Sequence, residues 1–260
     1  MHNVELTDLQ IREVFHLALL RALVPSPVGP HVVLKGGTNL RFFYASVRYS
    51  EDMDLDAGDI SVETLRDRVM TILRSPTFLD TIRTFGIARI VPPDMRVAKQ
   101  TATVQRFKVH LLTTAGIDLF TKVEFSRRGL DRPVRVEGVA APILAAYRMP
   151  PLVLPHYGPE AAIRQKLQAL LKRTAPQARD VFDLYWLSSQ PEAISGDVWR
   201  VPKPFGRQIR ETVLAMDYAQ YRDTVVSYLG SDDRDHYGGR EMWDEIRLAV
   251  VTRLEATGKS

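Results

Sequence analysis

The strongest constraint on the fold comes from one short stretch in which an apolar segment, two glycines and an alternating segment follow one another. Residues 31–34 are apolar and stop at Gly36 and Gly37, which predicts a buried strand that meets a turn. Residues 38–44 carry apolar side chains at helical intervals, so a helix is expected directly after the glycines. Residues 51–56 alternate acidic and apolar side chains, the period-2 pattern of a strand with one polar face. Together these elements predict an α/β domain.

Hydrophobic spacing extends this prediction over the whole chain. Helices are expected at 6–24, with Thr7 or Asp8 as N-cap, and at 62–73, and a hairpin is expected from strands at 104–111 and 119–125. Further helices are expected at 160–173, 179–187, 206–228 and 239–255. The predicted fold class is therefore α/β + α, with an α/β domain at 1–145 and a helical domain at 146–260.

Composition excludes several other classes. The 260 residues are 45% hydrophobic, which is enough to bury a core, and they include no cysteine. The absence of cysteine excludes a disulfide scaffold, a zinc–thiolate site and a thiol nucleophile, and is typical of a reducing compartment. No apolar run approaches the ~20 residues of a membrane span. We therefore expect a cytoplasmic protein with no membrane partner.

Asp52 and Asp54 form the most informative pair of side chains. Residues i and i+2 of a strand share a face, so these carboxylates are expected to project side by side. Neighbouring carboxylates repel each other unless a cation lies between them, and Mg²⁺ prefers oxygen ligands. Glycines ahead of a helix allow close approach of a phosphate to the helix N-terminus. The alternative is a solvated strand edge beside an ordinary turn.

These residues belong to a longer motif. The run Leu34–Asp56, LKGGTNLRFFYASVRYSEDMDLD, resembles the AbiEii/MenT-type nucleotidyltransferase toxins of the DNA polymerase β-like superfamily. A second segment resembles the lysine-bearing helix and the R-D-x-x-D-L motif of that family, with Lys166 in the first part and Asp180 and Asp183 in the second. The two motifs occur in the family's order and spacing. The fold expected from this resemblance is a nucleotidyltransferase-like domain with a mixed β-sheet, followed by a helical domain that completes the active-site cleft.

The resemblance implies a Mg²⁺-dependent nucleotidyltransferase toxin of a bacterial toxin–antitoxin system. Such an enzyme transfers a nucleoside monophosphate from an NTP to an RNA acceptor, here the 3′ end of tRNA, and so blocks translation and growth. The implied cofactor is a pair of Mg²⁺ ions, with Mn²⁺ as the alternative, and the implied partners are NTP, tRNA or another RNA, and a cognate antitoxin protein.

The resemblance also assigns roles to individual residues. The implied catalytic residues are Asp52, Asp54, Lys166 and Asp180. The implied nucleotide-binding residues are Lys35, Gly36, Gly37, Thr38, Arg48, Ser50 and Lys166. From the residues alone, Lys166 is an ordinary surface lysine, Asp180 a helix cap, and Asp56 a surface residue or a support for the other carboxylates. Asp183 is expected to lock two helices together.

Members of the superfamily carry a third metal-binding carboxylate on a later strand. Glu124 is the candidate, so the predicted metal ligands are Asp52, Asp54 and Glu124. Asp118 is the competitor but lies near a turn. The alternative for Glu124 is a simple ion pair with Lys108 or Lys122.

Positive charge gathers in one part of the chain. The net charge is only +4, but residues 96–135 hold nine lysines and arginines against three acidic residues. A phosphate backbone would be attracted there. Arg127 and Arg128 directly follow the strand that bears Glu124 and are the predicted RNA-binding residues. Two alternatives remain open: a nucleotidyltransferase that modifies a small-molecule or protein hydroxyl, and a non-catalytic nucleotide-binding module.

Overall fold

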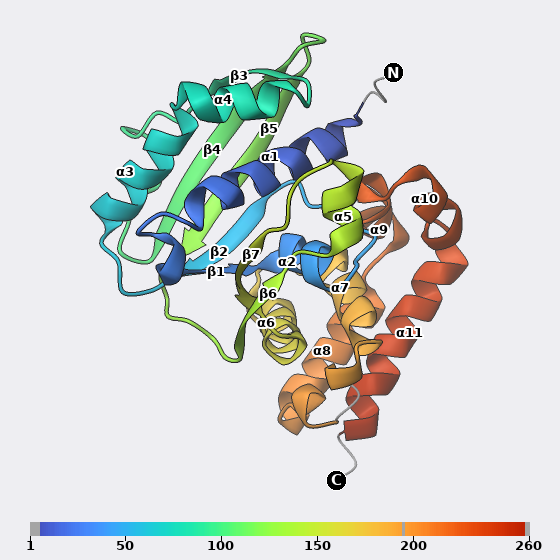
Figure 1. Ribbon diagram of the computed structural model, residues 1–260. Coiled ribbons are helices and arrows are strands. Elements are labelled where there is room, and N and C mark those ends of the chain that lie inside the picture. The colour runs from blue at the N-terminus through green and yellow to red at the C-terminus, as the bar shows by residue number, and fades with distance from the viewer. Residues whose placement is uncertain (1–5, 194–195, 258–260) are drawn as a thin grey trace. The chain divides into compact units, whose positions relative to one another are not determined.

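A seven-stranded mixed sheet is the framework of the computed structural model, which describes residues 6–193 and 196–257 (Figure 1). The strand order is β3-β4-β5-β2-β1-β7-β6. β2 pairs parallel with β5, and β1 pairs parallel with β7, whereas β1–β2 and the β3–β4–β5 meander are antiparallel. The strands are β1 (Val32–Lys35), β2 (Met53–Ala57), β3 (Ile87–Val91), β4 (Val104–Thr113), β5 (Asp118–Ser126), β6 (Val134–Gly138) and β7 (Val153–Tyr157).

The helices divide between the part of the chain that forms the sheet and the part that follows it. The first group comprises α1 (Asp8–Leu23), α2 (Gly36–Phe43), α3 (Val62–Leu73), α4 (Pro76–Arg83) and α5 (Ala141–Ala146). The second comprises α6 (Pro159–Lys172), α7 (Ala178–Ser188), α8 (Lys203–Ala215), α9 (Tyr218–Thr224), α10 (Ser231–Tyr237) and α11 (Arg240–Thr257). No helix in these described residues has the length and apolar character that a membrane crossing requires.

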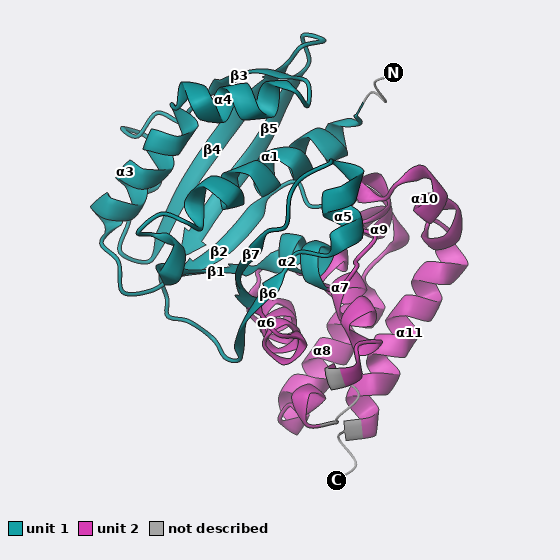
Figure 2. Cartoon of the chain, viewed as in Figure 1, with its two compact units in different colours: residues 1–43, 49–156 teal, residues 44–48, 157–260 magenta. Residues whose placement is uncertain are grey.

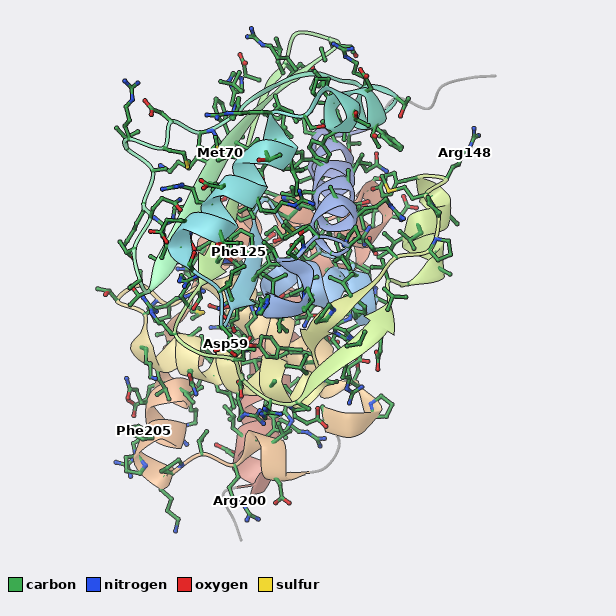
Figure 3. The ribbon with its side chains drawn as sticks, turned by 60° about the vertical axis from the view of Figure 1, so that its left-hand side comes forward. Asp59, Met70, Phe125, Arg148, Arg200 and Phe205 are labelled. Atoms are coloured by element: carbon green, nitrogen blue, oxygen red, sulfur yellow. The ribbon has the colours of Figure 1, made fainter. Side chains whose placement is uncertain are left out.

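One face of the sheet carries the core of the α/β part. Helices α1, α3 and α4 lie across β2, β4 and β5 on this face (Figure 1). Alternate residues of the strands fill the layer beneath them, and Phe107 and Phe125 meet edge to face at 5.9 Å there (Phe125 is labelled in Figure 3). Because side chains alternate along a strand, the acidic residues of β2 must project from the opposite face.

The chain forms two compact units (Figure 2). Unit 1 comprises residues 1–43 and 49–156, and unit 2 comprises residues 44–48 and 157–260. Unit 1 extends past the predicted boundary at 145 because β7, which follows that position, pairs with β1. The short segment 44–48 belongs to unit 2 because its backbone and side chains bind helices there: Trp186 Nε1 donates to the Tyr44 carbonyl oxygen at 2.7 Å.

An aromatic core holds the helices of unit 2 together. Tyr221 on α9 stacks on Trp243 of α11 at 4.4 Å, and both side chains are fully buried. Phe182 on α7 packs edge to face against Tyr237 at 5.7 Å. These large rings provide much of the buried apolar surface of a unit without a sheet.

The structure confirms the predicted fold class and most of its elements. Thr7 caps α1 with a reciprocal bond to Gln10, and β1, α2, β2, α3 and the β4–β5 hairpin lie where the pattern places them. The single helix predicted at 206–228 is wrong. Met216 is extended, with ψ 128°, and the Asp217 side chain accepts a bond from the Gln220 N–H, so α8 ends and α9 begins there.

Candidate active site

Asp54 lies at the centre of the polar face of the sheet. It occupies β2, with Lys35 of β1 opposite it on one side and Glu124 of β5 opposite it on the other. Asp52 immediately precedes β2. The sheet therefore brings Glu124 next to Asp54, as a third metal ligand would require. Asp118, the competitor, lies at the other end of β5 and pairs with His110 at 2.5 Å.

Gly36 is required by the position of Asp54. Its φ is +71°, in the left-handed region that favours glycine, and a Cβ on Gly36 would lie 2.9 Å from Asp54 Oδ2. The turn between β1 and α2 thus brings backbone directly against the carboxylate. This contact explains why the glycine and the carboxylate occur in one motif.

The loop that leads into β2 is held by hydroxyl groups. Thr38 Oγ1 and Ser50 Oγ both donate to the Asp52 carbonyl oxygen, at 3.1 and 2.8 Å. Thr121 Oγ1 donates to the neighbouring Glu51 carbonyl at 2.7 Å. Thr38 and Ser50 are predicted nucleotide-binding residues, and in the structure their hydroxyls fix the backbone of Asp52.

The two aspartates have different surroundings. The Asp52 carboxylate accepts the Lys122 backbone N–H at 3.0 Å and the Lys122 ammonium at 2.8 Å. Within the described residues, Asp54 makes no hydrogen bond or ion pair. Burial raises the pKa of Asp54, and Glu124 and Asp52 raise it further, against the opposing effect of Lys35 and Lys122.

Glu124 has a cationic partner, but not the one expected. Its Oε2 accepts Arg106 Nε from the adjacent strand at 2.7 Å. The alternative named a pair with Lys108 or Lys122, and these partners are wrong, because the hairpin register places Arg106 directly opposite Glu124 and Lys108 opposite Lys122.

The donor set fits a hard divalent cation. Asp54 is a half-buried carboxylate without a partner, and Asp52 and Glu124 add oxygen ligands of the type that Mg²⁺ prefers. In the part of the chain that the structure describes, no three acidic or histidine side chains are gathered closely enough to form a ready-made metal cage. Asp52 is paired with Lys122, and Glu124 with Arg106. These ion pairs would have to break before the carboxylate oxygens could bind a metal.

Lys35 is paired on the same face of the sheet. Its ammonium lies 2.5 Å from Asp56 Oδ1. Asp56 is only 5% exposed, so the surface alternative for this residue is wrong. The pair places a positive charge beside this buried carboxylate, at the end of β1 where α2 begins.

Lys166, Asp180 and Arg48 belong to one buried charge network in unit 2. The Lys166 ammonium lies 2.9 Å from Asp180 Oδ1 and 2.6 Å from Asp183 Oδ2. Arg48 binds both Asp183 oxygens, at 2.9 and 3.0 Å, and Arg173 binds Asp180 at 2.5 Å. Asp183 connects α6 and α7, as predicted. Asp180 is fully buried in the first turn of α7, whose N-cap is Gln177, so the capping alternative is wrong.

The same network determines the protonation of Lys166 and Asp183. Burial opposes the charged form of Lys166, but Asp183 and Asp180 outweigh it, so the pKa of Lys166 is raised. Burial opposes the charge of Asp183 as well, yet Arg48 and Lys166 hold its pKa below the usual range. Lys166 and Asp183 are therefore charged at neutral pH. The nucleotide contacts predicted for Lys166 and Arg48 stay predictions.

The two predicted RNA-binding arginines differ. Arg127 donates to Gln105 Oε1 at 3.2 Å and also to the Ile60 carbonyl oxygen, so its guanidinium links β4 to the loop before α3. Arg128 is exposed. Of the pair, Arg128 is the one whose side chain is available to a phosphate.

Arg106 and His16 were not found from the sequence, and Lys122 was named only as a possible partner of Glu124 and not as the partner of Asp52. Lys122 and Glu124 do lie on one face of β5, as the alternation of that strand predicts. His16 on α1 is buried, and its Nε2 lies 2.8 Å from Thr121 Oγ1. Because Thr121 donates its own proton to Glu51, His16 must be the donor, which requires a proton on Nε2.

This histidine makes the stability of the protein depend on pH. Burial lowers the pKa of His16 from 6.5 to about 4. As the pH falls from 6.5 to about 4, His16 therefore binds a proton in the unfolded chain but stays neutral in the folded protein. We expect the free energy of unfolding to decrease by about 3 kcal/mol over this window. Urea unfolding at several pH values measures it, and an equal dependence in His16→Gln would contradict the assignment.

Substitution of Gly36 tests the contact with Asp54. Gly36→Ala places a Cβ in the left-handed region and against the carboxylate, so we expect a loss of about 1–2 kcal/mol in unfolding free energy and a marked loss of activity. Gly116→Ala is the matched control, because that residue has φ +79° and no atom within 4 Å of its Cβ position. Equal activity of the two variants would show that the approach to Asp54 is unimportant.

Comparisons with known proteins agree with this fold. JHP933 from Helicobacter pylori is 20% identical, with a TM-score of 0.57 over 98% of this chain and 93% of that one. MenT4, the nucleotidyltransferase toxin Rv2826c from Mycobacterium tuberculosis H37Rv, is 22% identical, with a TM-score of 0.64 over 99% of this chain and 86% of that one. These similarities show the fold. No curated protein matches the sequence.

The family is shown by the sequence itself. A family model described as "Nucleotidyl transferase AbiEii toxin, Type IV TA system" matches residues 18–229, which include both motifs. This match confirms the resemblance and implies an NTP substrate and an antitoxin partner. The chain belongs to the AbiEii nucleotidyltransferase toxin family of type IV toxin–antitoxin systems, and it is a nucleotidyltransferase.

Proposed function

We propose that this enzyme transfers a nucleoside monophosphate from an NTP to the 3′ end of an RNA, with tRNA as the acceptor, and thereby stops translation and growth in the cytoplasm. The observation that carries the proposal is the polar face of the sheet. There Asp54 lies between Lys35 and Glu124, without an ion-pair partner among the described residues, and against the glycine turn that begins α2.

Asp52 and Asp54 would hold two Mg²⁺ ions, with Glu124 as a further ligand. Such ions activate the attacking hydroxyl and neutralise charge on the phosphates. The residues of this chain prepare the site. Thr38 and Ser50 fix the backbone of Asp52, and the turn at Gly36 keeps the start of α2 close to Asp54. The N–H groups at the start of α2 would face the triphosphate of the NTP.

An RNA acceptor is favoured over a small acceptor by the distribution of charge. Residues 96–135 include β4, β5 and a clear excess of lysine and arginine, and Arg128 is exposed at the end of β5. A polynucleotide would place several phosphates on this segment, whereas a small hydroxyl compound would not.

Salt dependence tests the choice of acceptor. For three or four phosphate contacts, we expect RNA affinity to fall by about an order of magnitude or more between ~50 and ~200 mM salt. Arg128→Glu should weaken RNA binding and reduce the salt dependence by the contribution of about one phosphate contact. Arg74→Glu, on the exposed end of α3, is the control. A shallow slope in the unchanged protein would favour a small acceptor.

A further inference from the structure

The polar face of the sheet continues beyond the carboxylates onto β4 and β5. Cross-strand pairs on this face run in order from Arg106 with Glu124, through Lys108 with Lys122, to His110 with Phe120. The residues between them, such as Val109 and Val123, are buried in the core on the opposite face. A row of basic and aromatic side chains therefore leads away from Asp52 and Asp54 within unit 1.

An aromatic pair that includes an exposed phenylalanine lies at the end of this row. Phe120 is 59% exposed, although a phenylalanine on a strand normally faces the core. Its ring stacks on His110 with the centroids 4.7 Å apart and the planes inclined by 19°. Arg12 of α1 donates to the Phe120 carbonyl oxygen at 2.9 Å, and Asp118 binds His110 at 2.5 Å. The pair is thus held in place by neighbours while one large apolar surface remains in solvent.

Positive charge separates this pair from the carboxylates. Lys108 is exposed, and Lys122, opposite it, reaches the Asp52 carboxylate at 2.8 Å. Lys122 and Phe120 are two residues apart on one strand, so their Cα atoms are ~6–7 Å apart. A base on Phe120 and a phosphate at the two lysines would match the spacing of successive parts of one nucleic-acid strand.

The order of the strands determines which substrate this surface would meet. The start of α2 follows β1, and β1 and β5 lie on opposite sides of β2. If the triphosphate binds at the start of α2, in-line displacement requires the attacking hydroxyl to approach from the opposite side of the reacting phosphorus. That side is β5 and β4, so the acceptor and not the NTP would reach Phe120.

We propose that an unpaired base at the 3′ end of the RNA acceptor stacks on Phe120, with its phosphates at Lys108 and Lys122. This inference rests on the proposed function, whose acceptor site it locates. Stacking on an aromatic ring accepts any base, because every base has a π-face. The surface would therefore bind an RNA end without reading its sequence.

Binding of a short single-stranded RNA to Phe120→Ala tests the stacking. We expect affinity for an oligoribonucleotide to fall about tenfold, with NTP affinity unchanged. Phe205→Ala is the matched control, because Phe205 on α8 of unit 2 is 49% exposed (labelled in Figure 3). Lys108→Glu should weaken RNA binding and reduce its salt slope. Unchanged RNA affinity in Phe120→Ala would overturn the inference. The same holds if this variant loses affinity only for the antitoxin and not for RNA.

A thermodynamic cycle that combines Phe120→Ala with a modified RNA distinguishes lost stacking from a general disturbance of the protein surface. With an RNA that lacks its 3′-terminal bases but keeps the sugar–phosphate backbone, Phe120→Ala should cost little further affinity. An equal loss for the complete and the abasic RNA would contradict stacking.

Pyrophosphate release by the unchanged protein in the presence of RNA distinguishes failure of the proposed function from failure of the stacking inference. No release with any RNA refutes the proposed function and this inference together, whereas normal release with full RNA affinity in Phe120→Ala refutes the inference alone.

Discussion

Asp54→Asn is expected to reduce nucleotidyl transfer by about a thousandfold. The amide keeps the shape of the side chain but lacks the charge that would hold the metal ions, and loss of metal-ion stabilisation costs several kcal/mol in the transition state. Because burial raises the pKa of Asp54 and the carboxylate has no ion-pair partner among the described residues, removing its charge should leave the melting temperature equal or higher.

Two measurements, pyrophosphate release and thermal unfolding of the same samples, check this prediction. Asp56→Asn is a useful comparison, since Asp56 lies on the same face of β2 but is paired with Lys35. That variant should lose stability because it leaves a lysine without its partner. Cooperative unfolding of Asp54→Asn at a much lower temperature would instead indicate that Asp54 has a structural role.

Lys166→Ala is expected to destabilise unit 2 strongly. The substitution removes the cation that lies between Asp180 and Asp183, both fully buried, and leaves their charges only partly compensated by Arg173 and Arg48. Breaking a buried pair in this way typically costs about 3–5 kcal/mol. Urea unfolding should show this loss, and Lys172→Ala, an exposed lysine on the same helix, should unfold like the unchanged protein.

The alternative for Lys166 is a direct contact with the triphosphate, as the family resemblance implies. In that case Lys166→Ala would lose turnover while its unfolding free energy stayed within about 1 kcal/mol of the unchanged protein. Lys166→Arg helps to separate the two roles, because a guanidinium retains the charge but cannot occupy the site of a compact ammonium. Stability that is largely restored without turnover would indicate that the lysine contributes to catalysis as well.

Local signals in the sequence predicted the centre of the site. A glycine pair between an apolar strand and a helix, and acidic residues alternating with Met53 and Leu55, depend only on neighbours in the chain. They were sufficient to place Asp54 on the polar face of β2 and the glycines at the turn that begins α2. The structure adds the reason for Gly36, which is the 2.9 Å approach of Asp54.

Long-range pairing explains what the sequence did not reveal. β7 was missed because it is short, contains Pro155 and gains its place by pairing with β1, far away in the chain. The partners of the carboxylates depend on register. Lys122 binds Asp52 across 70 residues, and Arg106 meets Glu124 only because the hairpin turn sets that alignment. The bond between Arg48 and Asp183 spans 135 residues and has no local signature.

The most direct test of the central claim is incubation of the unchanged protein with total RNA, Mg²⁺ and each labelled NTP in turn, followed by sequencing of the labelled RNA 3′ ends. We expect label at the 3′ ends of tRNA, none when Mg²⁺ is chelated, and almost none with Asp54→Asn. Label on a protein or a small molecule, or equal labelling by Asp54→Asn, would contradict it.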